Sequence, residues 1–134
     1  MSERQQRVVL VVEPERELRD LAGDQLRQAD YMVFTAATAS EAREWLQEFY
    51  PDLMLLSADL PGADVLIREQ RLRYGDARMN LPVVFLGSSD SMEELRQGYE
   101  QGALCHIFRS DAARRLPQLL ESALERLELE SDPN

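Results

Sequence analysis

Five short apolar runs alternate with longer amphipathic stretches along the chain, and this alternation is what most constrains the fold. Each run is too short for a helix and is rich in Val, Leu or Phe, which favours a strand. Unbroken apolar runs of this length are typical of parallel strands buried on both faces of a sheet. The runs occupy residues 7–12, 31–36, 52–56, 82–87 and 103–108.

The stretches between these runs carry apolar residues at helical spacing. Thr38 with Glu41, and Ser91 with Glu94, have the spacing of capping boxes and predict two helix starts. Pro117 is compatible with the first turn of the last helix. Helices are therefore predicted over 15–29, about 38–49, 64–74, about 91–101 and from about 116 to 127.

Strands that alternate with helices predict an α/β fold, a doubly wound parallel sheet of five strands with helices on both faces. Sites in such folds lie beyond the carboxyl ends of the strands. The residues there are Glu13 and Pro14 after the first strand, Ser57 and Asp59 after the third, Gly87 and Ser88 after the fourth, and Arg109 after the fifth.

The length and charge limit the classes of protein to which the chain can belong. Its 134 residues suit one domain over 1–134, with a core of about 7–127 and a frayed acidic tail. A net charge of −10 disfavours direct binding of nucleic acid or an anionic membrane. One cysteine and no long apolar run agree with a cytoplasmic protein without an internal disulfide or membrane span.

The stretch "YPDLMLLSADLPGADVL", together with "VVLVVEPERELRDLA", "LPVVFLGSS" and "GALCHIFRS", resembles the receiver domain of two-component response regulators. The resemblance covers roughly residues 7–127. It implies the flavodoxin-like architecture of the CheY-like type, with strand order 2-1-3-4-5 and a role in phosphorelay signalling.

The same resemblance aligns the family's metal-binding and phosphorylation residues with side chains of this sequence that mostly cannot do the same chemistry. Its two metal-binding acids fall on Glu13 and Pro14, and its phospho-acceptor aspartate falls on Ser57. Its hydroxyl residue falls on Gly87, and its lysine falls on Arg109. The chain is thus similar to a degenerate receiver, or pseudo-receiver, and Mg²⁺ is not expected.

The chemistry of the residues agrees with this interpretation. Ser57 cannot form an acyl phosphate, and a serine hydroxyl is a weak nucleophile unless a base activates it. Mg²⁺ prefers carboxylate oxygens, and Pro14 has none. Asp59, two residues beyond Ser57, is the alternative acceptor if the chain is a true phosphoreceiver.

The function expected from the sequence is that of a non-enzymatic module that binds another protein, or a second copy of itself, without phosphorylation. The resemblance implies that the partner surface is the face of the fourth helix, fifth strand and last helix, near Tyr99 and His106. The alternatives are a receiver phosphorylated at Asp59 and a flavin- or nucleotide-binding flavodoxin-like domain. Against the last, the acidic loop "EPERE" offers no Gly, Ser or Thr to hold a phosphate.

One expectation concerns the geometry of the site at which receivers are phosphorylated, called the pocket below, which here contains Glu13, Asp59 and Arg109. Glu13, Asp59 and Arg109 should converge, because the carboxyl ends of parallel strands meet at one edge of the sheet. Two carboxylates close together repel each other, and a guanidinium fork can compensate them. We therefore expect Arg109 to pair with Glu13 or Asp59, within about 4 Å.

Overall fold

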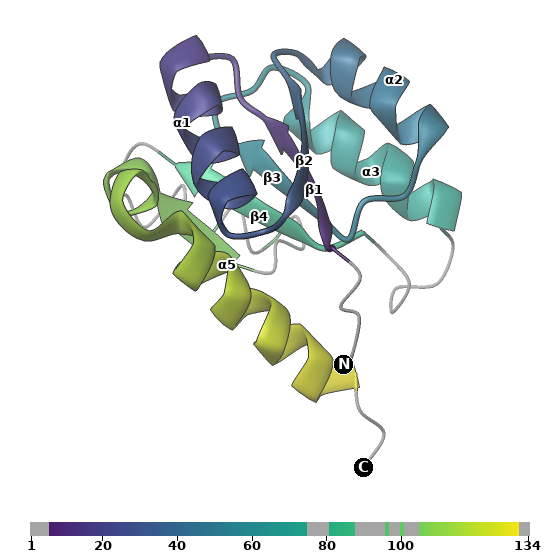
Figure 1. Ribbon diagram of the computed structural model, residues 1–134. Helices are drawn as coiled ribbons and strands as arrows, with labels where there is room; N and C mark the ends of the chain where they lie inside the picture. The colour runs from purple at the N-terminus through teal and green to yellow at the C-terminus, as the bar shows by residue number, and fades with distance from the viewer. Residues whose placement is uncertain (1–5, 75–80, 88–95, 97–99, 101–104, 132–134) are drawn as a thin grey trace.

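The computed structural model describes residues 6–74, 81–87, 96, 100 and 105–131. Five parallel strands form one sheet in the order β2-β1-β3-β4-β5, with helices on both faces (Figure 1). The strands are β1 Val8–Val12, β2 Met32–Ala36, β3 Leu53–Ser57, β4 Val83–Gly87 and β5 Cys105–Phe108. The helices are α1 Arg16–Gln28, α2 Ala39–Glu48, α3 Ala63–Tyr74 and α5 Arg109–Ser131. The predicted fold class and strand order are confirmed.

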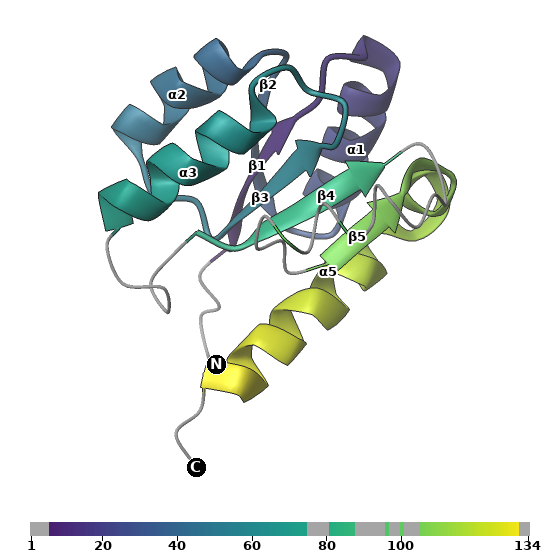
Figure 2. The ribbon, with the colours of Figure 1, turned by 180° about the vertical axis from the view of Figure 1, so that it is seen from behind.

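Successive side chains of the strands face opposite sides of the sheet, so each strand contributes to two cores. Val9 and Val11 of β1 lie in the core that α1 and α5 cover. Leu10 and Val12 lie in the core that α2 and α3 cover. Figure 2 shows the sheet from behind, with α2 and α3 on one side and α5 on the other. Burial on both faces explains why the inner strands β1, β3 and β4 are almost entirely apolar instead of alternating.

Helix ends follow from local sequence at two places. Thr38 caps α2, since its side chain accepts a hydrogen bond from the Glu41 backbone N–H. Glu41 Oε2 accepts in return from the Ala37 backbone N–H at 3.2 Å, one residue earlier than in a standard capping box. At the end of α1, Asp30 has a φ of 72° and closes a Schellman turn. In that turn the Tyr31 N–H donates to the Leu26 carbonyl, and the Asp30 N–H donates to the Arg27 carbonyl.

The last helix begins earlier than predicted. The sequence favoured a start near Leu116, but helical structure begins at Arg109, directly after β5. Arg115 interrupts it with φ −151° and ψ 40°, so α5 consists of two segments. Pro117 therefore lies in the first turn of the second segment, as predicted. The predicted helix over 91–101 lies largely outside the described residues.

Candidate functional site

Three strand ends bring the predicted residues Glu13, Ser57, Asp59 and Arg109 together. Glu13 follows β1, and its backbone N–H donates to the carbonyl of Ala36 at 3.0 Å, continuing the pairing with β2. Ser57 is the last residue of β3 and Arg109 the first of α5. This convergence follows from the parallel topology, which collects the carboxyl ends of the strands at one edge.

Two consecutive turns after β3 determine where Asp59 lies. The Leu60 N–H donates to the Ser57 carbonyl, and the Ala63 N–H donates to the Leu60 carbonyl. Gly62 has φ 82°, which with Pro61 before it is the pattern of a type II turn. The Ser57 hydroxyl accepts from the Asp59 backbone N–H at 3.3 Å, a local Ser turn. Asp59 is thus held over the end of β3, although its side chain remains 55% exposed.

One guanidinium nitrogen of Arg109 contacts the three other site residues. Its Nη2 lies 3.1 Å from Asp59 Oδ2, 3.5 Å from Glu13 Oε1 and 3.2 Å from Ser57 Oγ. The expected pairing of Arg109 is therefore confirmed, with both carboxylates. The expected fork geometry is not seen among the described residues, where a single nitrogen, Nη2, makes all three contacts. Within the described part of the chain, the buried Arg109 Nε has no hydrogen-bond partner.

Glu13 is the buried member of the site, with 1% of its side chain exposed. Its Oε2 accepts from the Glu15 backbone N–H at 2.8 Å, so each carboxylate oxygen has a positively polarised neighbour. Arg19 does not touch the carboxylate in these contacts. Its Nη1 donates to the carbonyls of Glu13 and Pro14, at 3.0 and 3.3 Å, and fixes the loop from α1. Arg19, one helical turn beyond the loop, was not predicted from the sequence as a site residue.

The remaining predicted positions have different outcomes. Pro14 is exposed in the loop after β1, and Gly87 is buried at the end of β4. His106 lies partly buried in β5, with its ring centroid 5.3 Å from that of Phe108. Ser88 and Tyr99 lie outside the described residues.

The described residues contain no group of three or more His, Cys, Asp or Glu side chains arranged to hold a metal ion. None of the helices in that part of the chain is both long and apolar enough to cross a membrane.

The model of the response regulator receiver domain family matches residues 9–121. The chain belongs to this family. It is 27% identical over 120 residues to the phosphate regulon transcriptional regulatory protein PhoB of Pseudomonas aeruginosa. That alignment covers 90% of this chain and 52% of PhoB, so the chain spans about half the length of this relative.

Solved structures of receiver domains have the same fold. NtrX from Brucella abortus aligns with a TM-score of 0.81 and 27% identity, over 94% of this receiver and 28% of NtrX. The CheY-like receiver from Methanospirillum hungatei JF-1 aligns with a TM-score of 0.77 and 22% identity, over 95% and 100% of the two chains. CheY4 of Vibrio cholerae aligns with a TM-score of 0.73 and 22% identity, over 92% and 99%. The family match over residues 9–121, together with the relationship to PhoB, places the chain among two-component receiver domains.

Proposed function

We propose that this receiver domain is a pseudo-receiver, which binds a protein partner without being phosphorylated. The observation that carries the proposal is the position of Arg109 Nη2, in contact with Glu13, Ser57 and Asp59 at once. A positive charge built into the chain thereby occupies the place where carboxylates converge. Arg109 offsets one of the two carboxylate charges, those of Glu13 and Asp59, without an added cation.

Ser57 is poorly suited to accept a phosphoryl group. Its oxygen accepts hydrogen bonds from the Asp59 N–H and from Arg109 Nη2, which engages the lone pairs that a nucleophile needs. Its side chain is fully buried, so an incoming phosphodonor has no direct approach to it. A serine also needs a base to remove its proton.

The pocket residues do not fit Mg²⁺. This ion takes oxygen ligands at about 2.0–2.1 Å in near-octahedral geometry. Glu13 Oε1 and Asp59 Oδ2 are both in contact with the same guanidinium nitrogen, and Glu13 Oε2 is bonded to a backbone N–H. Pro14, at the second acidic position of the family pattern, offers no side-chain oxygen. A cation entering here would have to displace Arg109 against charge repulsion.

The partner surface that we propose is the face formed by the fourth helix, β5 and α5, by analogy with other receivers. The described part of this face comprises β5, with the partly buried His106, and α5. The partner would be a protein or a second copy of the chain. The charge of −10 still argues against nucleic acid as a direct ligand.

One observation favours a second candidate function, phosphorylation at Asp59. Its carboxylate is 55% exposed and lies 3.1 Å from a cation, so a phosphodonor could reach it. The flavin- or nucleotide-binding alternative has no such support. In the loop after β1, the N–H of Glu15 is already bonded to the Glu13 carboxylate and is not free for a phosphate.

A titration with Mg²⁺ and then beryllofluoride, followed by amide NMR, separates the two functions. We expect the resonances of Ser57, Asp59 and Arg109 to stay in place, while a phosphorylatable receiver in the same buffer responds. Saturable shifts that disappear in Asp59→Asn would establish the second function and overturn the proposal.

A further inference from the structure

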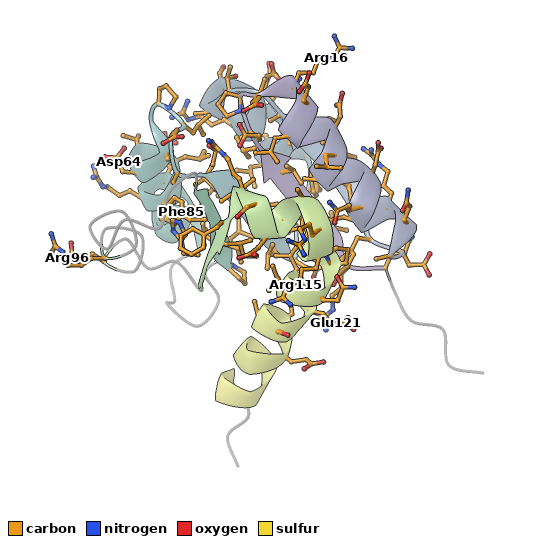
Figure 3. All side chains as sticks on the ribbon, turned by 90° about the vertical axis from the view of Figure 1, so that its left-hand side faces the viewer. Arg16, Asp64, Phe85, Arg96, Arg115 and Glu121 are labelled. Carbon is orange, nitrogen blue, oxygen red and sulfur yellow. The ribbon has the colours of Figure 1, made fainter. Side chains whose placement is uncertain are left out.

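The break in α5 divides the helix into a segment that carries Arg109 and a longer segment that begins at Leu116. The two segments run in clearly different directions (Figure 1), and Figure 3 shows Arg115 labelled beside the bend. A helix end leaves backbone N–H and carbonyl groups without partners in the helix, so such a break needs groups from elsewhere to satisfy them.

Gln25 of α1 supplies these groups from across the interface. Its Nε2 donates to the carbonyls of Ala112 and Ala113, at 2.8 and 3.1 Å, in the first segment. Its Oε1 accepts from the N–H of Leu116, at 3.3 Å, in the second segment. One side chain thus bonds to both sides of the break.

The chemistry of the three contacts requires a carboxamide. Two carbonyls need two N–H donors, and the N–H of Leu116 needs an acceptor, which the amide provides on adjacent atoms. A glutamate lacks the donors, a lysine lacks the acceptor and an asparagine is one methylene shorter. Ala112 and Leu116 are buried, at 2% and 0% exposure, whereas Ala113 is exposed, so Gln25 is needed most at Ala112 and Leu116.

We infer that Gln25 is a positioning residue, which fixes the angle between the two segments of α5. By holding the first segment, it also fixes the approach of Arg109 to Glu13, Ser57 and Asp59. By holding the start of the second segment, it sets the direction of the rest of α5. The contacts of Gln25 thus link the Arg109 site to the second segment of α5 through α1. This role of Gln25 does not depend on whether Asp59 can be phosphorylated.

The test compares Gln25→Met with Gln28→Met, the same substitution at an exposed position of the same helix. We expect hydrogen exchange of the Leu116 amide to become about tenfold faster in Gln25→Met, since its acceptor is lost. The distance between spin labels at Glu48 and Glu125, both exposed, should shift or broaden as the angle is released. Both readouts should stay unchanged in Gln28→Met.

Should Gln25→Met not fold, Gln25→Asn replaces it, because this variant keeps the amide but cannot span the break. The same two changes are expected. The inference would be overturned by a folded Gln25 variant that matches Gln28→Met in both readouts, the exchange rate of the Leu116 amide and the distance between the two spin labels.

Discussion

Replacing Arg109 with methionine tests whether this residue stabilises the pocket. The change keeps a long side chain but removes the charge that faces Glu13, Ser57 and Asp59. Breaking a fully buried ion pair costs about 3–5 kcal/mol, because the remaining charge is left without compensation. Glu13 is buried at 1% exposure, so this cost is the upper bound on the stability that Arg109→Met can lose.

Two features of the site lower that bound. Glu13 keeps its 2.8 Å bond from the Glu15 N–H, and the Arg109 side chain is 24% exposed, so water can reach part of the vacated space. The half-exposed pair with Asp59 contributes only about 0–1 kcal/mol. We therefore expect Arg109→Met to lower the free energy of unfolding by about 2 kcal/mol, the value typical of a lost hydrogen bond to a charged group.

Urea unfolding, followed by the fluorescence of Trp45, the single tryptophan, measures this loss. With a slope of about 2 kcal/mol per molar, the midpoint should fall by about 1 M. Arg109→Lys should lose clearly less, because one nitrogen makes the three contacts and an ammonium has three donors. A folded Arg109→Met with an unchanged midpoint, or no coupling with Glu13→Gln in a double-mutant cycle, would show that Arg109 does not stabilise the site.

Three further predictions concern stability. Thr38→Ala, measured by chemical denaturation, should cost about 1 kcal/mol, because it removes the cap on the Glu41 N–H; Ser40→Ala on the same helix is the control. Asp30→Gly should gain about 0.5–1 kcal/mol, since φ is 72° there and glycine adopts this conformation freely; a loss of stability would contradict it. Burial, and then the charge of Glu121, raise the pKa of Tyr31 above its ordinary value of 10.0, although Arg7 lowers it. Above about pH 10 the unfolded chain therefore loses this proton first and stability falls, an effect that Tyr31→Phe should reduce.

The sequence predicted the sheet well because its signal is local and strong. Buried parallel strands are short and apolar throughout, and the strand bounds in the structure lie within about two residues of the apolar runs. The meeting of Glu13, Asp59 and Arg109 was predictable from topology, since parallel strands end at one edge.

The details that were missed depend on contacts distant in sequence. The segment Arg109–Arg114 has little apolar periodicity, so no helix was predicted there. The carbonyl of Ala112 at its end accepts a hydrogen bond from Gln25, which is 87 residues away in the sequence. Two further contacts depend on side-chain packing that no local pattern encodes. They are the contacts of Arg109 Nη2 with the site residues and the hydrogen bond from Arg19 to the carbonyl of Glu13. Asp59 could be placed only once the two turns after Ser57 were known.

The mass of the intact chain shows whether the site of Glu13, Ser57, Asp59 and Arg109 takes up a phosphoryl group. The chain is incubated with acetyl phosphate and Mg²⁺ beside a phosphorylatable receiver, and Asp59→Asn is treated in parallel. We expect no added phosphoryl group on this chain under conditions that modify the other receiver. Addition of one phosphoryl group, absent in Asp59→Asn, would rule out the pseudo-receiver proposal and would make Asp59 the acceptor.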